Sequence, residues 1–215
     1  MAKLPRVGHT KTRLCPPLTL AQAAALYEAF LTDVLQAASQ VLHLQLVIAV
    51  TPPEATDYFQ KMAPAGALPM PIECATIGRC LDGVLAALLA KGHSMVGALS
   101  SDSPTVSPDV IRLGFERLHG ADVVLSPGDD GGYYFIGVKS RHPGLFADDI
   151  PWSTPQVAAR TLARARDLGL SVDLLPPILD VDTAEDLQRL RRELARLPQT
   201  RATHTRRALS SLDLL

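Results

Sequence analysis

The chain has 215 residues, 47% of them hydrophobic and 20% charged, so it can bury a sizeable core and does not belong to the disordered class. Its 21 Lys and Arg residues against 22 Asp and Glu residues give a net charge of −1, which argues against a protein that binds nucleic acid generally. The longest apolar stretches fall short of the roughly 20 residues that span a bilayer, and the first 14 residues are too polar for a signal peptide, so we expect a cytoplasmic protein without a membrane span.

Helical and strand patterns alternate in the first half of the chain. Apolar residues recur at steps of three and four from Leu20 to Ala38, which predicts a long amphipathic helix. The elements expected after it are a buried strand over residues 44–50, a short helix over 53–62, a strand over 72–77, a helix over 80–91 and an apolar strand over 95–99.

The second half continues in the same way. Ser107, Pro108 and Asp109 predict a helix that runs to about residue 119, because they supply an N-cap, a proline at the first helical position and an acid in the first turn. The elements expected after it are strands over residues 123–125 and 133–138, a helix over 154–168, a strand over 172–175 and a helix over 183–197.

The expected strands are mostly continuous apolar runs that alternate with helices. This pattern is typical of an α/β fold with a largely parallel sheet covered on both faces. Neither a repeat nor a composition shift marks a boundary within residues 1–197, so these are expected to form one domain. Residues 198–215 are expected to be a basic, flexible tail, with docking of an anionic partner as the alternative.

Three cysteines, Cys15, Cys74 and Cys80, show no CxxC spacing. An odd number without metal-ligand spacing favours neither a disulfide framework nor a structural zinc site. We therefore expect reduced thiols.

Basic residues gather immediately before the first expected helix. They are Lys3, Arg6, His9, Lys11 and Arg13, with Pro5 and Gly8 among them. Backbone N–H groups and cationic side chains of such a loop can converge on a di- or triphosphate, although solvated charge is the simpler interpretation.

Three carboxylates follow expected strands, where α/β sheets bind their ligands. Asp102 follows the strand at 95–99 and could hold Mg²⁺ or Mn²⁺ against phosphate oxygens, or could only form a turn. Asp180 and Asp182 precede a capping box formed by Thr183 and Asp186, and neither is needed for that cap. A metal or substrate contact is therefore expected for at least one of them.

Two further phrases combine turn residues with aromatic rings. The run from Asp129 to Tyr134 holds two acids, two glycines and two tyrosines, which suits either an Asp-Gly hairpin or a sugar or nucleoside site. The single tryptophan, Trp152, precedes Ser153, Thr154 and Pro155 at a helix start and could either pack or bind.

These phrases, in this order, resemble the bacterial DUF2064 proteins, described as rSAM/selenodomain-associated transferase 1 and as glycosyltransferase-like. The resemblance covers residues 2–194. The matching residues are Ala2-Lys3-Leu4-Pro5, Gly8, Lys11-Thr12-Arg13-Leu14, Leu26-Tyr27, Phe30, Asp33, Ser101-Asp102-Ser103-Pro104, Ser126-Pro127, Asp130-Gly131-Gly132-Tyr133-Tyr134, Ile136-Gly137, Ile150-Pro151-Trp152-Ser153-Thr154-Pro155, Asp180-Val181-Asp182-Thr183 and Glu185-Asp186-Leu187.

The resemblance implies a three-layer α/β/α, Rossmann-like GT-A fold, that of the nucleotide-diphospho-sugar transferases, and a metal-dependent transferase. The activated donor would be a nucleotide or nucleotide-sugar and the acceptor a small molecule. Transfer of a sugar is the preferred interpretation; transfer of a nucleotidyl group with release of pyrophosphate, or nucleotide binding without catalysis, are the alternatives.

The same resemblance assigns roles to residues. Lys3, Gly8, Lys11 and Arg13 would bind the nucleotide phosphates. Asp102, Asp182 and Asp180 would hold the Mg²⁺ or Mn²⁺ ion. Independently of the resemblance, the residue type and place of Asp130 make it the candidate for orienting or deprotonating the acceptor. From the composition of their phrases, Gly131, Gly132, Tyr133, Trp152, Ser153 and Thr154 are expected to contact substrate.

The chain also departs from the family pattern. Family members begin with a full apolar strand before the Lys-x-Pro phrase, whereas only Met1 and Ala2 precede Lys3 here, so a truncated first strand or a late start codon is expected. The phrase over residues 78–83 matches its counterpart only partly, and Val7 stands where proline is common.

Overall fold

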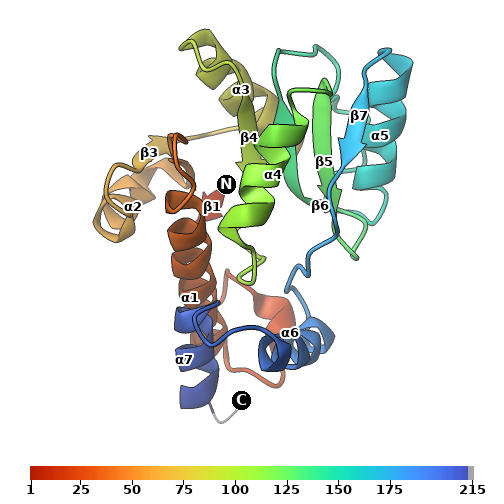
Figure 1. The fold of residues 1–215 in the computed structure, drawn as a ribbon. Coiled ribbons are helices and arrows are strands. Elements are labelled where there is room, and N and C mark those ends of the chain that lie inside the picture. Colours follow the sequence, from red (N-terminus) through yellow and green to blue (C-terminus); the bar gives the residue numbers. More distant parts are fainter. Residues whose placement is uncertain (213–215) are drawn as a thin grey trace. The chain divides into compact units, whose positions relative to one another are not determined.

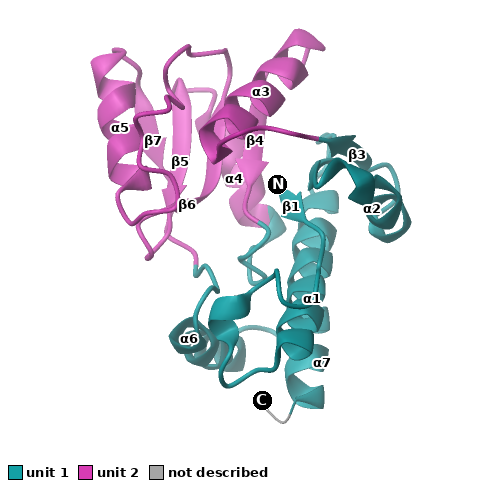
Figure 2. Cartoon of the chain, turned by 180° about the vertical axis from the view of Figure 1, so that it is seen from behind, with its two compact units in different colours: residues 1–71, 101–108, 179–215 teal, residues 72–100, 109–178 magenta. Residues whose placement is uncertain are grey.

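A computed structural model describes residues 1–212. The chain forms two compact units, each built from segments that are distant in sequence (Figure 2). Unit 1 comprises Met1–Pro71, Ser101–Pro108 and Leu179–Leu215, and unit 2 comprises Ile72–Ser100 and Asp109–Ile178. One domain over residues 1–197 stays a prediction.

The sheet of unit 1 contains three parallel strands. In order they are β1 (Ala2–Lys3), β2 (Val47–Thr51) and β3 (Leu68–Pro71) (Figure 1). The first strand is short, as expected, and pairs with Val50 and Thr51. The prediction of a strand over residues 72–77 is wrong, because the observed strand β3 ends at Pro71 and Ile77 begins a helix. The two prolines of β3 are typical of a loop, but a strand at the edge of a sheet tolerates them.

The helices of unit 1 pack on one apolar core. They are α1 (Leu20–Ser39), α2 (Thr56–Met62), α6 (Ala184–Arg196) and α7 (Thr203–Ser211), with short 3-10 helices at Thr12–Leu14 and Pro53–Ala55. A capping box between Thr19 and Gln22 starts α1. Leu26 and Phe30 of α1 and Leu187 of α6 belong to the same buried cluster, which fixes α6 and the loop before it.

Helix α7 lies in the segment expected to be a flexible tail, so that expectation is wrong for Thr203–Ser211. The buried carboxylate of Asp33 on α1 accepts the backbone N–H groups of His204 and Thr205 at 3.0 and 2.7 Å. Leu209 is fully buried on the same helix. A cap supplied by another helix leaves no local signal in the sequence of α7.

The sheet of unit 2 is mixed. Its order is β4 (Val96–Leu99), β6 (Tyr133–Val138), β5 (Val123–Pro127) and β7 (Val172–Leu174), with β6 antiparallel to β4 and β5, and β7 parallel to β5. The helices of this part of the chain are α3 (Ile77–Ala90), α4 (Pro108–Arg117) and α5 (Val157–Asp167). The α/β class with parallel and mixed pairing is thus confirmed.

Cys74 and Cys80 form a disulfide across the start of α3, with their Cα atoms 5.5 Å apart. The expectation of reduced thiols is wrong for this pair, because the first turn of α3 returns Cys80 to the loop that holds Cys74. Cys15 is free, as expected. Within residues 1–212, no helix has both the length and the apolar character needed to cross a membrane.

Candidate functional site

The basic loop before α1 is held together by one buried hydroxyl. Thr10 Oγ1 accepts the backbone N–H of Arg6 at 3.0 Å and donates to the carbonyl of Leu4 at 3.1 Å. The N–H groups of His9 and Thr10 also bond to the Arg6 carbonyl, so the chain forms a closed turn. Gly8 in this turn has a φ of +78°, which glycine adopts without steric cost.

Lys11 leaves that turn in a left-handed conformation, with φ 51° and ψ 37°. Its ammonium nitrogen lies 2.8 Å from Asp102 Oδ1 and 2.6 Å from Asp182 Oδ1, and only 5% of its side chain is exposed. All three residues belong to unit 1, and all three were predicted site residues. The structure thus joins a predicted phosphate ligand to two predicted metal ligands, across 171 residues of sequence in the case of Asp182.

Electrostatics explains why a buried lysine keeps its charge here. Burial lowers the pKa of Lys11, but the carboxylates of Asp102, Asp182 and Asp180 outweigh this effect and raise its pKa above the usual value. The ammonium is therefore a fixed positive charge between carboxylates at neutral pH.

Tyr27 on α1 supports this cluster, although its helical spacing marks it only as a core residue. Its hydroxyl bonds to Ser101 Oγ at 2.9 Å and accepts the backbone N–H of Lys3 at 3.1 Å. The Lys11 ammonium lies 5.9 Å from the centre of its ring. Burial, with a smaller contribution from the Asp102 carboxylate, raises the pKa of Tyr27 to about 12.

The loop before α6 is joined to the loop that carries Asp102. The backbone N–H of Val181 donates to the Asp102 carbonyl at 3.0 Å, and Ser103 Oγ donates to Asp180 Oδ1 at 3.1 Å. Ser103 is fully buried and was not among the predicted site residues. The predicted capping box between Thr183 and Asp186 is confirmed.

Two of the residues predicted to bind phosphate lie farther from the centre of the cluster. Arg13 is 71% exposed, and its guanidinium is 4.0 Å from Asp182 Oδ2. Lys3 is exposed, and among the described residues its backbone N–H is the group that bonds to the cluster. Both side chains are exposed to solvent.

The carboxylates of unit 1 suit a hard divalent cation. Asp102, Asp180 and Asp182 offer only oxygen ligands, the type that Mg²⁺ and Mn²⁺ prefer. Asp102 and Asp182 already share one cation, the Lys11 ammonium. The type of donor therefore fits the expected metal ion, and carboxylate oxygens of Asp180 and Asp182 lie within 4.8 Å of one another.

The predicted substrate residues of unit 2 form a second group. Asp130 Oδ1 accepts the backbone N–H of Gly132 at 2.9 Å, which closes the turn between β5 and β6. Gly131 has a φ of +83° and contacts the backbone of Pro155 so closely that no Cβ could fit. The turn is thus packed against the loop of Ser153 and Thr154.

The aromatic residues of this group are mostly engaged in packing. A Cβ on Gly78 of α3 would lie 2.6 Å from the Trp152 ring, whose Nε1 donates to the Ala147 carbonyl at 3.3 Å. Burial raises the pKa of Tyr133, whose hydroxyl is enclosed. Thr154 Oγ1 donates to the Pro151 carbonyl, and Ser153 has a φ of +64°.

The fold has clear counterparts among solved structures. A candidate nucleotide-diphospho-sugar transferase from Desulfovibrio desulfuricans G20 superposes with a TM-score of 0.88 at 28% identity, over 98% of this chain and 93% of that one. A cytidylyltransferase from Leptospira borgpetersenii gives 0.58 at 11% identity, over 86% and 84% of the two chains, and supports the fold alone. The chain is a transferase of the nucleotide-diphospho-sugar transferase fold.

Sequence comparison identifies the family. Residues 34–154 match the family described as "Uncharacterized protein conserved in bacteria (DUF2064)". A 3-phospho-D-glycerate guanylyltransferase from Phenylobacterium zucineum is 31% identical over 205 residues, 90% of this chain and 87% of that protein. The chain belongs to the DUF2064 family.

Proposed function

We propose that this protein is a metal-dependent nucleotidyltransferase that joins a nucleoside monophosphate to a phosphorylated acceptor. A phosphate oxygen of the acceptor attacks the α-phosphorus of a nucleoside triphosphate, the bond to the β-phosphate breaks, and pyrophosphate leaves. The observation that carries the proposal is the contact of Lys11 with Asp102 and Asp182 in one cluster.

The cluster has the charges that such a reaction needs. Negative charge increases on the leaving pyrophosphate, so cations held in place beforehand stabilise the transition state. Lys11 is buried and charged, and Arg13 lies within reach at the edge of the cluster. A phosphate acceptor is already ionised at neutral pH, so this reaction requires no base to generate the nucleophile.

Asp102, with Asp180 and Asp182, would hold Mg²⁺ or Mn²⁺, which neutralises charge on phosphate oxygens when bound. Tyr27 holds Ser101, the residue before Asp102, and Ser103 positions Asp180. The charge of Lys11 keeps Asp102 and Asp182 together without a metal ion, which lowers the cost of assembling three carboxylates. Asp130 and Gly131 in unit 2 are the proposed acceptor residues.

The Phenylobacterium relative provides the first substrates to try, GTP and 3-phospho-D-glycerate. Sugar transfer is the second candidate, because the Desulfovibrio counterpart is a candidate nucleotide-diphospho-sugar transferase. The two reactions differ in product: nucleotidyl transfer releases pyrophosphate, whereas sugar transfer from a nucleoside-diphosphate sugar releases a nucleoside diphosphate.

The experiment supplies the purified protein with each nucleoside triphosphate, 3-phospho-D-glycerate and either Mg²⁺ or Mn²⁺, and measures pyrophosphate and the joined product by mass spectrometry. A parallel arm supplies nucleotide-sugars and measures free nucleoside diphosphate. Mn²⁺ binding is measured separately by calorimetry.

Asp102→Asn should remove pyrophosphate release and weaken Mn²⁺ binding at least tenfold. The matched control is Asp57→Asn, which neutralises an exposed acid on α2 and should change neither. Nucleoside diphosphate without pyrophosphate would assign sugar transfer instead. Nucleotide binding with no turnover in either arm would support the non-catalytic alternative.

A further inference from the structure

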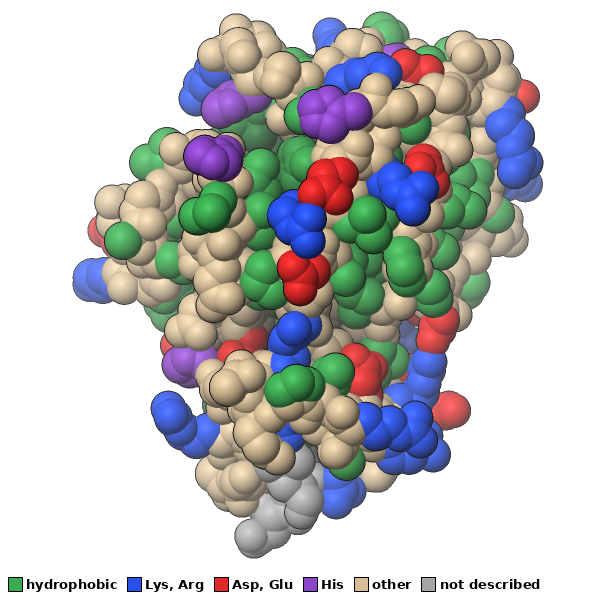
Figure 3. All heavy atoms as spheres, viewed as in Figure 1, with side chains coloured by type: hydrophobic (Ala, Val, Ile, Leu, Met, Phe, Trp, Pro, Cys, Tyr) green, Lys and Arg blue, Asp and Glu red, His purple; other side chains and the backbone are tan. Residues whose placement is uncertain are grey.

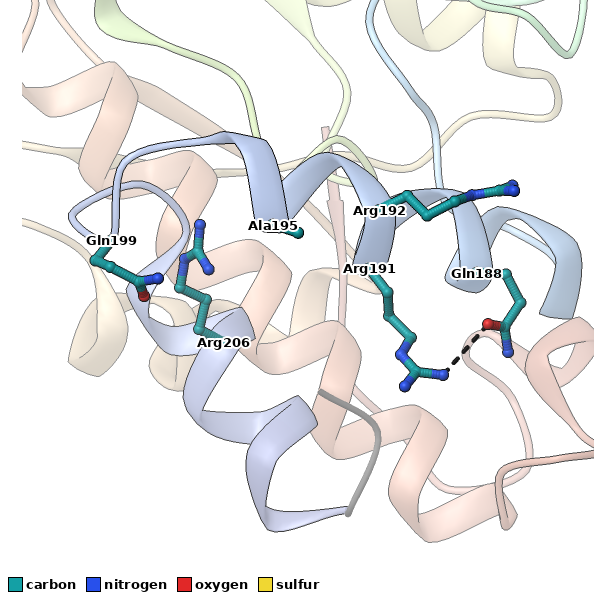
Figure 4. Close-up of a pocket in the computed structure, with 6 residues that line it drawn as sticks. All are labelled: Gln188, Arg191, Arg192, Ala195, Gln199 and Arg206. Atoms are coloured by element: carbon teal, nitrogen blue, oxygen red, sulfur yellow. Dashed lines mark hydrogen bonds between the residues drawn. The ribbon is translucent and has the colours of Figure 1, made fainter.

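Unit 1 carries an open pocket of about 620 Å³ between α6, the segment after it and the first half of α7. It is lined by Gln188, Arg191, Arg192, Ala195, Gln199 and Arg206. Figure 4 shows Arg191 beside Gln188 at one end, Arg206 with Gln199 toward the other, and the small Ala195 between them. Lys and Arg side chains gather over the α6 region of the face in Figure 3, which shares the view of Figure 1.

One wall of the pocket is formed by Arg206, whose guanidinium is held in place by hydrogen bonds. The Arg206 guanidinium, 9% exposed, donates to the carbonyls of Leu194, Leu197, Pro198 and Arg201 at 2.6 to 3.3 Å. Three of these carbonyls follow α6, and the Leu194 carbonyl belongs to its last turn, where the negative end of the helix dipole favours a cation. Arg206 thus closes the end of α6 and keeps its charge at the pocket.

The other wall is a helix face that presents cations without acids. Gln188, Arg191, Arg192 and Ala195 lie at steps of three, one and three on α6, beside the buried stripe of Leu187, Leu190 and Leu194. Arg191 donates to Gln188 Oε1 at 3.2 Å. Among residues 1–212, neither Arg191, Arg192 nor Arg206 forms an ion pair with a carboxylate.

This lining favours charged ligands over aromatic ones. The guanidinium groups of Arg191 and Arg192 and two amides supply N–H donors, and a planar guanidinium matches phosphate oxygens. Arg206, whose Nε and Nη2 donate to carbonyls, contributes mainly its charge. The lining has no aromatic side chain on which a nucleobase could stack and no large aliphatic side chain for an apolar ligand. A compact, multiply charged phosphorylated anion meets these conditions best.

We propose that the α6 pocket is a second anion site, separate from the Lys11 cluster, that binds a small phosphorylated compound through Arg191 and Arg192 against the fixed charge of Arg206. The α6 pocket can bind a free oligophosphate or a phosphate ester, since both present the same oxygens. The site does not depend on the reaction proposed above.

The test is calorimetric titration of the full chain with inorganic pyrophosphate and, in a second arm, with 3-phospho-D-glycerate, both without divalent metal. The variant is Arg191→Ala/Arg192→Ala, and the matched control is Arg196→Ala/Arg207→Ala, which removes the same charge from exposed positions outside the pocket. The pocket variant should lose at least tenfold in affinity for one of the two probes, and the control less than threefold. The arm that responds identifies the kind of anion.

A second variant, Ala195→Glu, places a carboxylate in the middle of the pocket on a helix that favours Glu, and should cause the same loss. Unchanged affinity in both pocket variants would overturn the proposal, with binding at Lys11 as the remaining explanation. An equal loss in the control would also overturn it, since general attraction to a basic surface would then be sufficient.

Discussion

The carboxylate of Asp33 accepts the backbone N–H of Thr205 at 2.7 Å, so a residue in the middle of α1 caps the start of α7. His204 donates to the other oxygen of the same carboxylate at 3.0 Å. Asp33→Ala removes both acceptors and leaves two N–H groups without partners beside a buried surface. We expect a loss of about 2 kcal/mol in the free energy of unfolding, measured by urea denaturation.

Thr32→Ala is the control for Asp33→Ala, because Thr32 is the neighbouring residue and its hydroxyl donates to the Glu28 carbonyl on the exposed face of α1. It should change the unfolding free energy by less than about 0.5 kcal/mol. Equal losses in the two variants would show that the cap does not hold α7.

Lys11→Met removes the charge that joins Asp102 to Asp182. Two carboxylates then face each other without the ammonium between them, while the exposed Arg13 guanidinium remains 4.0 Å from Asp182. We expect a loss of about 2 kcal/mol at pH 7, between the values for exposed and buried pairs. The carboxylates are 30% and 38% exposed, which keeps the loss below that of a fully buried pair.

Chemical denaturation measures this change, with Lys91→Met as the control because Lys91 is exposed at the end of α3. The control should be neutral. A neutral Lys11→Met variant would contradict the structural importance of the cluster.

The ionisation of Tyr27 predicts how stability depends on pH. Its pKa is raised to about 12 by burial and by Asp102, whereas in the unfolded chain it is about 10. Between these values the unfolded chain has lost the proton and the folded chain keeps it, so stability falls as the pH rises through this window. Tyr27→Phe should lessen the fall by up to about 1.4 kcal/mol per pH unit.

Urea denaturation at several pH values from about 9 to 12 measures the slope of the unfolding free energy against pH. Other groups also titrate there, so the comparison is the difference between Tyr27→Phe and the parent protein. Parallel curves over the whole window would contradict the raised pKa.

Gly131→Ala tests the contact between the two loops of unit 2. The new Cβ would collide with the Pro155 backbone, and the φ of +83° disfavours any side chain. The expected loss is about 3 kcal/mol. Gly144→Ala is matched in backbone conformation, with a φ of +88°, but its Cβ meets no atom within 4 Å, so its loss should be about 1 kcal/mol. Thermal unfolding of both variants separates collision from strain; equal losses would show that the loops do not touch.

The disulfide between Cys74 and Cys80 predicts a thiol count. Without reductant, the denatured protein should show one reactive thiol, Cys15, and after reduction it should show all three. Closing so short a loop stabilises the fold by about 2 kcal/mol, so Cys74→Ser/Cys80→Ser should unfold at correspondingly lower urea concentration. Three free thiols before reduction would contradict the pairing.

Local patterns predict much of the fold. The strand at 133–138 is confirmed to the residue, and the helical stripe from Leu20 to Ala38 lies within α1. The positions of Asp102, Asp180 and Asp182 after expected strands predict that they lie close together, because in this fold class ligands bind at the carboxyl ends of the strands.

What the sequence does not predict is set by contacts between distant residues. Tyr27 belongs to an apolar stripe, and only the structure shows its hydroxyl against Ser101. Lys11 is predicted to bind phosphate, and its place between two carboxylates depends on residues 91 and 171 positions away in sequence. Likewise, α7 lies in a segment whose local sequence indicates a tail, and the residue that caps it, Asp33, is on α1.

The discontinuity of unit 1 has a consequence for its synthesis on the ribosome. N-terminal segments leave the ribosome first, yet the partners of Lys11 and Asp33 include Asp182, His204 and Thr205. Unit 2 has all of its segments once Ile178 has emerged, whereas α1 and the basic loop must wait for the last stretch of chain. During translation the carboxylate cluster is therefore incomplete until late, and in a nascent chain without α7 the part of α1 that packs against α7 stays exposed.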